Sequence, residues 1–282
     1  MEKSNKLLKF IIVIAIVFIL IGAVFCGAAY AFGGMYVDSK LDNDNSSYAS
    51  PSVSKIEISD GVANIKLLKS SDDNGEISVK AENILLEYYK CEISGGALKI
   101  SYNPDKYKFG FISFPSFFFE RNMKSPEINV YIPAGKVLDE IYFKSGVGNI
   151  SIEEINAESF IIGGGVGNYD IKNMTAGSLR INGGVGDVRF SGIINGGTVI
   201  DGGLGNLNIS GQANGDIRLK GGVGNVNLNL TGDINDYNIK VDSGVGNIRI
   251  NGKKTSEFTN SSGSKYNIDV DGGLGNINID IK

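Results

Sequence analysis

The octet SGVGNISI at residues 145–152 decides the fold, because close copies of it follow along the rest of the chain. Six further copies begin at residues 164, 183, 202, 221, 243 and 272, and a diverged copy, DGVANIKL, occupies 60–67. The spacing is constant from the copy at 145 to the copy at 221, and the intervals before the copies at 243 and 272 are longer. Repetition of this kind is typical of an architecture in which each unit stacks on its neighbours.

Apolar and polar residues alternate on both sides of each octet. In one copy Ile217 and Leu219 precede the glycine turn, and Val226 and Leu228 follow it. Such period-two alternation predicts strands with one buried face. We therefore expect an all-β fold, a single-stranded and right-handed β-solenoid whose unit of about 19 residues is a strand, a glycine turn, a strand and a loop.

The Gly-x-Gly segment of each copy supplies positions that can adopt positive φ angles, so the chain can bend sharply between two strands. An apolar residue stands between the two glycines, and we expect its side chain to plug the corner of the coil. These residues are Val147, Val166, Val185, Leu204, Val223, Val245 and Leu274.

The residue after the second glycine is asparagine in six of the seven close copies and aspartate in the other. Asparagine tolerates the left-handed region and bonds to neighbouring amides, so stacked copies should form a ladder. We expect a structural role for this turn ladder, which consists of Asn149, Asn168, Asp187, Asn206, Asn225, Asn247 and Asn276.

Residues 10–32, FIIVIAIVFILIGAVFCGAAYAF, contain no charged residue. As a helix they would reach about 34 Å, which is enough to cross a bilayer core. Lysines predominate before this run and aspartates after it, which places residues 1–9 in the cytoplasm. We therefore expect a cytoplasmic tail at 1–9, a transmembrane helix at 10–32 in the cytoplasmic membrane, a flexible linker at 33–54 and an exported repeat domain at 55–282.

A cleaved signal peptide is the alternative for the same run. Ala29 and Ala31 flank Tyr30 as in a cleavage site, which would release the chain after Ala31. The apolar run is longer than the 7–15 residues typical of a signal peptide, so we favour the retained anchor. The fate of the anchor stays open at this point.

Composition excludes several classes of site. The chain has no histidine and two cysteines, which excludes Ser-His-Asp catalysis and zinc clusters, and its formal net charge of −4 argues against nucleic-acid binding. The glycine motifs lack the third glycine and the helix of a dinucleotide site, and they lack the aspartates of a calcium-binding β-roll. Asp201, Asp242 and Asp271 share one repeat position, and Glu153 and Glu154 are adjacent, but neither group resembles a positioned acid–base pair. We expect no catalytic residue, cofactor or metal.

An aromatic-rich insertion at 102–126 interrupts the repeats, and its three prolines exclude a long regular element. It either caps the solenoid or presents an apolar patch to a membrane or protein partner. The residues that would bind such a partner are Phe109, Phe111, Phe114, Phe117, Phe118 and Phe119.

The segment INVYIPAGKVLDEIYFKSGVGNISI at 128–152, together with the GVGN-type octets, resembles the putative adhesin family of bacterial membrane-anchored β-strand-repeat proteins. This resemblance covers residues 55–282 and implies an amino-terminal anchor and an exported repeat domain without catalytic residues. We expect a non-enzymatic module for surface adhesion, binding or envelope scaffolding, with an unidentified protein or an envelope polysaccharide as partner. The alternatives are an accessory component of an envelope-stress or regulatory system that works through the aromatic insertion, and a carbohydrate-active β-helix enzyme.

Overall fold

The computed structural model describes residues 41–282 apart from 60–61, 72–74, 105–106, 110–111, 115–124, 145, 221, 243, 256–263 and 272. The predicted transmembrane helix therefore lies outside the described residues. Within the described part the helices are the short 3-10 turns η1 (Ser50–Ser52), η2 (Leu86–Tyr88) and η4 (Ile234–Asp236). None of the helices in these ranges has the length and hydropathy that a membrane crossing needs.

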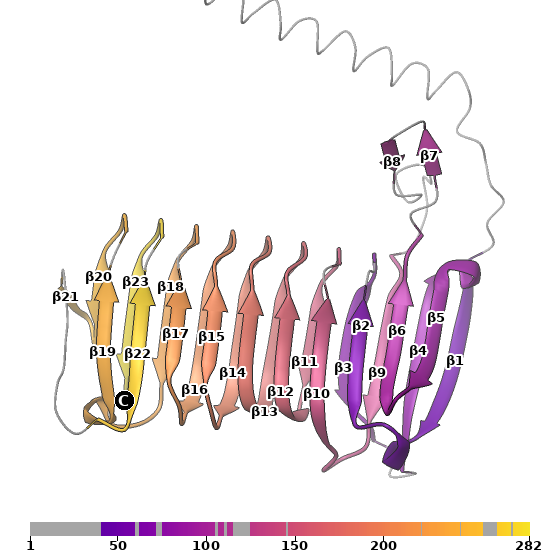
Figure 1. The fold of residues 1–282 in the computed structure, drawn as a ribbon, viewed down its shortest axis with the longest axis horizontal. Coiled ribbons are helices and arrows are strands. Elements are labelled where there is room, and N and C mark those ends of the chain that lie inside the picture. The colour runs from indigo at the N-terminus through magenta and orange to yellow at the C-terminus, as the bar shows by residue number, and fades with distance from the viewer. Residues whose placement is uncertain are drawn as a thin grey trace, which may run out of the picture.

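Most strands belong to two files of parallel strands, which face each other across an apolar core (Figure 1). The before-turn file consists of β2 (Lys55–Ser59), β6 (Ala97–Tyr102), β10 (Val137–Lys144), β12 (Asn156–Gly163), the second half of β13 (Tyr169–Asn182), β15 (Thr198–Asp201), β17 (Ile217–Lys220), β19 (Tyr237–Asp242) and β22 (Tyr266–Asp271). The after-turn file consists of β3 (Asn64–Lys69), β9 (Glu127–Ile132), β11 (Ile150–Glu153), the first half of β13, β14 (Val188–Ile194), β16 (Leu207–Ala213), β18 (Val226–Leu230), β20 (Ile248–Ile250) and β23 (Ile277–Ile281). We call the edge formed by the glycine turns the turn edge and the opposite edge the loop edge.

Equivalent residues of stacked coils pair directly. Ile181 pairs with Ile200 in the before-turn file, and Tyr169 pairs with Val188 in the after-turn file, so each residue meets its counterpart in the next copy of the repeat. The predicted all-β, solenoid-like fold is therefore confirmed. The right-handed sense of the coil stays a prediction.

The coils do not all stack in chain order. β22 pairs with β17 on one side and with β19 on the other, so the last repeat lies between the fifth and the sixth close copies. The unequal intervals have a physical reason, because a unit of the regular length reaches only the adjacent coil. The longer interval before the copy at 243 carries the chain past one coil. The interval before the copy at 272 is longer still, includes β21 (Lys253–Thr255) and brings the chain back.

The amino-terminal end of the rod shows the same exchange. β2 lies between β6 and β10, and β3 lies between β9 and β11, so the coil made of β6 and β9 is outermost. The connection from β6 to β9 holds the aromatic-rich insertion, which therefore replaces the glycine turn of this terminal coil. In that connection β7 (Tyr107–Phe109) and β8 (Ile112–Phe114) form an antiparallel pair.

Antiparallel strands cover the amino-terminal end. β4 (Glu76–Ile84) pairs with β9, β1 (Asp42–Ala49) pairs with β4, and β5 (Tyr89–Ser94) pairs with β6. The prediction of a flexible linker at 33–54 is therefore wrong for residues 42–49. The reason is that β1, with one exposed face and one partly buried face, is held by backbone pairing and needs few apolar residues. Its polar sequence is therefore similar to that of a tether.

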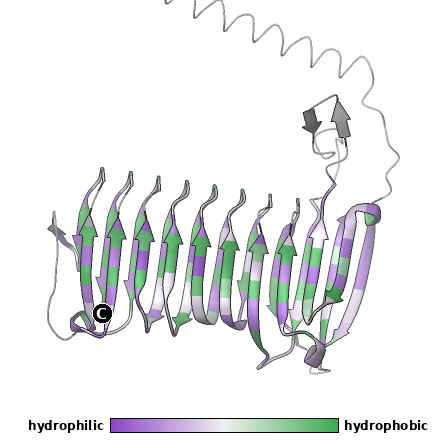
Figure 2. Ribbon diagram, viewed as in Figure 1, coloured by the Kyte–Doolittle hydropathy of each residue, from purple (hydrophilic) through white to green (hydrophobic). Residues whose placement is uncertain are grey.

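Inward rows of like side chains fill the space between the two files. Figure 2 shows the hydrophobic residues alternating with hydrophilic ones along the strands. One row has exposed fractions of 1% or less and consists of Ile141, Phe160, Leu179, Thr198, Ile217, Ile268 and Ile239. The rings of Phe143 and Phe160 meet edge to face at 6.0 Å between centroids. The core is thus continuous along the rod, and each coil depends on its neighbours for burial.

Candidate functional site at the turn edge

The turn ladder forms one file along the turn edge. In each link the side-chain Oδ1 of one residue accepts a hydrogen bond from the backbone N–H of its equivalent in the next coil, over 2.9 to 3.1 Å. In rod order the ladder residues are Asn64, Asn149, Asn168, Asp187, Asn206, Asn225, Asn276 and Asn247.

Asn64 belongs to this ladder although the sequence analysis did not include it. Its Oδ1 accepts from the N–H of Asn149 over 3.0 Å. The signal was present, because Asn64 occupies the ladder position of the diverged octet at 60–67. Asp187 fits among asparagines because the ladder uses an oxygen acceptor, and the Nδ2 of Asn206 donates to the same carboxylate oxygen over 3.1 Å.

The close stacking of the coils requires glycine at the second glycine position of each turn. A Cβ atom on Gly205 would overlap the carbonyl group of Gly186 in the neighbouring coil, and the φ of Gly205 is 145°. The diverged copy carries Ala63 at this position. Its neighbour toward the amino-terminal end is the terminal coil, in which the insertion replaces the turn, so no stacked glycine turn opposes the methyl group.

The apolar residues between the glycines, which we call the apolar row, are not sealed inside the corner as predicted. Their exposed fractions lie between 46% and 68%. The reason is that several of these side chains line a hollow that is open to solvent, so the corner is not closed. The row consists of Val147, Val166, Val185, Leu204, Val223, Leu274 and Val245, each bridged to the next along the rod.

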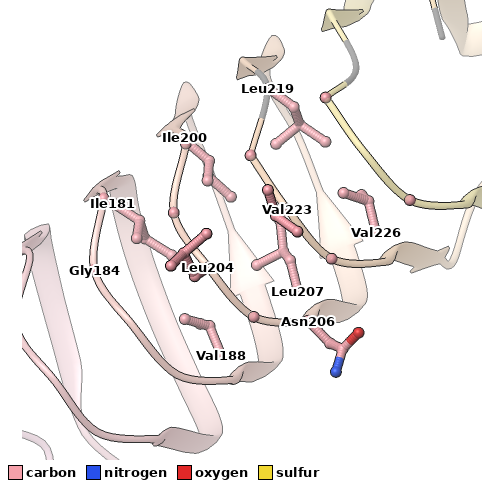
Figure 3. Close-up of a pocket in the computed structure, with 18 of the residues that line it drawn as sticks. Ile181, Gly184, Val188, Ile200, Leu204, Asn206, Leu207, Leu219, Val223 and Val226 are labelled. Carbon is pink, nitrogen blue, oxygen red and sulfur yellow. The ribbon is translucent and has the colours of Figure 1, made fainter. Parts of the chain in front are cut away.

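An apolar hollow of about 100 Å³ lies behind part of this row. In Figure 3, Leu204 and Val223 lie among the last inward residues before the turn, such as Ile200, and the first after it, such as Leu207. This volume is well below the roughly 300 Å³ at which pockets for drug-sized ligands begin. The hollow is therefore a narrow apolar slot along the rod.

One polar side chain is built into this edge. The Tyr169 hydroxyl donates to the carbonyl oxygen of Gly164 over 3.0 Å, and burial raises the pKa of this phenol. The hydroxyl therefore stays protonated near neutral pH and holds the turn at 164–168.

The residues proposed to bind a partner belong to the connection between β6 and β9. The backbone of Phe109 is in β7 and that of Phe114 is in β8. Phe111, Phe117, Phe118 and Phe119 lie outside the described residues. The two ends of this connection, at Tyr102 and Glu127, thus belong to the terminal coil.

The carboxylates considered for catalysis are distributed along strands. Asp201 pairs with Lys220, Lys220 pairs with Asp271, and Asp271 pairs with Asp242. Glu154 instead binds the ammonium group of Lys69 over 2.7 Å. Within the described ranges no group of three or more Cys, Asp or Glu residues is arranged to hold a metal ion.

The one cysteine in the described residues is not activated. Burial raises the pKa of the Cys91 thiol, and the neighbouring Tyr48 hydroxyl donates to the carbonyl oxygen of Cys91 over 2.8 Å. Burial, followed by this neighbourhood, raises the pKa of Tyr48 to about 12. Both groups therefore stay protonated, and Tyr48 of β1 and Cys91 of β5 pack against the core as structural side chains.

Comparison with solved structures finds similar proteins from bacteria. A structure from Bacteroides fragilis, described as a "putative adhesin", shares 19% identity, with 85% of this chain and 98% of that chain aligned and a TM-score of 0.47. One from Clostridium sporogenes, a "putative cell adhesion protein", shares 16% identity over 86% of this chain and 100% of that chain, with a TM-score of 0.39. A "putative adhesin" from Parabacteroides merdae shares 15% identity over 85% and 97%, with a TM-score of 0.31.

The curated proteins contain no match to the sequence. A family description matches residues 53–271, which is most of the chain and includes all strands from β2 to β22. The chain therefore belongs to the Toastrack DUF4097 family.

Proposed function

We propose that this chain is a membrane-anchored, extracytoplasmic rod that acts as a non-enzymatic module for surface adhesion, binding or envelope scaffolding. The observation that carries the proposal is the flat outer face of the after-turn file. There the stacking aligns one outward residue from each coil into a row, at the strand spacing of about 4.8 Å. The row consists of Ser151, Asp170, Arg189, Asn208, Asn227, Asn278 and Arg249.

This row is polar and partly organised by its own contacts. The Nδ2 of Asn227 donates to the Oδ1 of Asn208 over 2.8 Å, and the Nδ2 of Asn278 donates to the Oδ1 of Asn227 over 2.8 Å. Solenoids use such extended, repeated surfaces to bind long partners. An envelope polysaccharide with its own repeat is the partner that such a row suits best.

The anchor part of the proposal rests on the charge-free run at 10–32 and the lysine-rich tail before it. To test it, an epitope tag is placed at each end of the full chain, and protease is added outside intact cells. Loss of the carboxy-terminal tag with protection of the amino-terminal tag is expected, with permeabilised cells as the control. Protection of both tags would contradict the orientation.

The binding part is tested by co-sedimentation of the full chain, in detergent, with purified envelope polysaccharide. The double variant N208A/N227A should bind at least fivefold more weakly than the unchanged chain. The double variant N238A/N267A is the matched control, because it removes a similar amide pair, joined over 3.2 Å, from the other file. Equal binding by both variants would exclude the after-turn face as the binding surface.

The position of the aromatic insertion favours a second candidate function. Because the insertion connects β6 to β9, it belongs to the terminal coil, and a regulatory membrane protein would bind it at that end of the rod. Replacement of Phe117, Phe118 and Phe119 with serine should then abolish capture of that partner in a pull-down while the thermal unfolding of the rod is unchanged. Undiminished capture would exclude this function.

A further inference from the structure

The apolar row runs along the whole length of the turn edge, beside the turn ladder. The side chains of the apolar row are about half exposed, and parallel bridges join them into one file from Val147 through Val185 and Val223 to Val245. Among the residues from the first to the last position of the seven GVGN-type turns, Asp187 is the one with a charge. Such a file of exposed apolar side chains on an otherwise polar rod marks an interaction surface.

The backbone N–H and C=O groups of the apolar row are hydrogen-bonded between coils, which suits an environment of low polarity. The N–H of Leu204 donates to the carbonyl of Gly184 over 2.9 Å, and the carbonyl of Leu204 accepts from the N–H of Gly186 over 2.8 Å. The same pattern recurs at Val166, Val185 and Val223. Because unpaired backbone groups are what makes loops costly to remove from water, these bonds lower the cost of placing the edge against lipid.

The chain joins the rod at this same edge. β1 is antiparallel to β4 and β4 is antiparallel to β9, so β1 runs in the direction of the after-turn strands and starts at the turn edge. Residues 33–41 separate the predicted membrane helix from Asp42, the first residue of β1. Nine residues span at most about 30 Å, so the anchor holds the amino-terminal end of the turn edge within that distance of the bilayer.

We propose that the turn edge lies against the outer surface of the membrane, with the apolar row in contact with lipid. The inference rests on the anchor of the proposed function and adds an orientation: the rod lies along the bilayer rather than projecting from it. A second protein copy suits this edge less well, because a row one side chain wide offers far less than the roughly 800 Å² per partner of a stable protein interface.

The absence of tryptophan from the sequence allows a direct test with single-tryptophan variants of the full chain. Leu204 is 52% exposed in the apolar row, and Ile193 is 38% exposed near the loop edge, so L204W and I193W are a matched pair. Each variant is reconstituted into phosphatidylcholine vesicles with either ordinary or brominated acyl chains. Brominated lipid should quench the L204W emission at least twofold and leave the I193W emission unchanged.

Two further measurements separate the possible results. Addition of V185D and V223D to L204W should abolish the quenching while the chain still unfolds cooperatively, and V166W replaces L204W if the latter does not fold. Equal quenching of the L204W and I193W emission overturns the inference. An L204W emission that is blue-shifted but not quenched also overturns it, because it would show that protein rather than lipid covers the apolar row. Failure of the chain to float with the vesicles overturns the anchor as well, whereas flotation without quenching overturns the orientation alone.

Discussion

At the scale of single residues, the second glycine of each turn is required by two independent constraints. Its φ lies in a region that side chains rarely adopt, and a Cβ would overlap the carbonyl of the coil beside it. Ala63 escapes both constraints, because its φ is not positive and no stacked glycine turn lies on its amino-terminal side. The glycine motif is therefore explained by the close stacking of the coils rather than by ligand binding.

The substitution G205A should destabilise the rod by about 3 kcal/mol or more, because it combines backbone strain with a steric overlap that neither coil can relieve. The control is G197A, since the Cβ at Gly197 would meet nothing within 4 Å. That control should change the free energy of unfolding by less than about 1 kcal/mol. Denaturant unfolding of both variants is the measurement, and equal stability would show that the coils stack less closely than described.

The substitution N225A removes an acceptor from the backbone N–H of Asn276 and a donor to the Oδ1 of Asn206. We expect a loss of about 1–2 kcal/mol, since the amide of Asn276 loses its partner in the ladder. N225D retains an acceptor oxygen, as Asp187 does, and should cost less. N229A, at an exposed position of the same coil, is the control, and thermal melts compare the three. A loss no larger than that of N229A would refute a stabilising ladder.

Glu127 should make the amino-terminal end sensitive to acid. The hydrogen bond from Lys66, over 2.8 Å, and then that from Asn129 lower the pKa of this carboxyl. Because the pKa is lower in the folded chain, the stabilisation is present above the ordinary pKa of a glutamate and is lost as the pH falls through the folded value. E127Q should therefore cost about 1 kcal/mol at pH 7 and very little at pH 3.

The pH dependence of E127Q is measured by denaturant unfolding at both pH values. E87Q, at an exposed position in η2, is the control. A stability difference that is the same at pH 3 and pH 7 would show that Glu127 does not act through its charge.

At the scale of elements, the strands and their register could be predicted from the sequence because alternation and spacing are local. The alternation at Ile217 and Leu219 predicts a buried face, and the constant interval between copies predicts that equivalent positions pair. The stacking order of the last coils could not be predicted, because all glycine turns are chemically alike and any of them can stack on any other. The longer intervals before the copies at 243 and 272 were its one sequence signal.

The candidate site was predicted in part for a related reason. The asparagines were found because their side chains bond along the repeat direction, which the sequence spacing reports. The exposure of Val185 and Leu204 was missed, because it depends on the hollow that the turns leave open, and no sequence pattern reports the shape of a turn. β1 was missed because its polar residues are paired through their backbone.

Because the last coils do not stack in chain order, two deletions of equal length should have different effects. Deletion of residues 188–206 removes one repeat unit and joins equivalent positions, so the remaining coils keep their register. Truncation of residues 264–282 removes a segment of the same length, but it takes β22 and β23 from between two coils. We expect the internal deletion to fold, and the truncation to leave β19 and β20 without their partner.

Limited proteolysis followed by mass spectrometry distinguishes the two shortened chains. In the truncated chain, residues 231–255 should be cleaved rapidly while the preceding coils stay protected. If that segment is as resistant as in the unchanged chain, the sixth copy has stacked directly on the fifth, and chain order is an accessible alternative to the exchange.

At the scale of the whole molecule, both ends of the repeat domain are interior coils. The first coil of the chain, β2 with β3, and the last, β22 with β23, each lie one position in from an end of the rod. The outermost coils come from segments that are internal in sequence and carry the antiparallel strands β5 and β21. Closing the rod in this way covers strand edges that would otherwise pair with other molecules.

The length of the rod should follow the number of coils in direct proportion. Lys99 and Lys240 are exposed and occupy the same outward row in the two outermost coils. They are eight strand steps apart along the pairs Lys99–Glu57–Tyr142–Ile161–Arg180–Val199–Arg218–Asp269–Lys240. Spin labels at these two positions should lie about 38 Å apart. Three additional copies of residues 188–206, placed after Asn206, should add about 14 Å.

Electron spin resonance distance measurements on the full chain, with Cys26 and Cys91 replaced by alanine, make this comparison. The lengthened chain should also melt at a higher temperature, because each added coil contributes its own contacts with two neighbours and no new chain end. An unchanged distance would mean that the added units loop out instead of stacking, and the stability of a coil would then depend on its particular neighbours. An increase of about 4.8 Å for each added unit would show that one glycine turn can substitute for another. That property allows the last repeat to lie between two earlier ones.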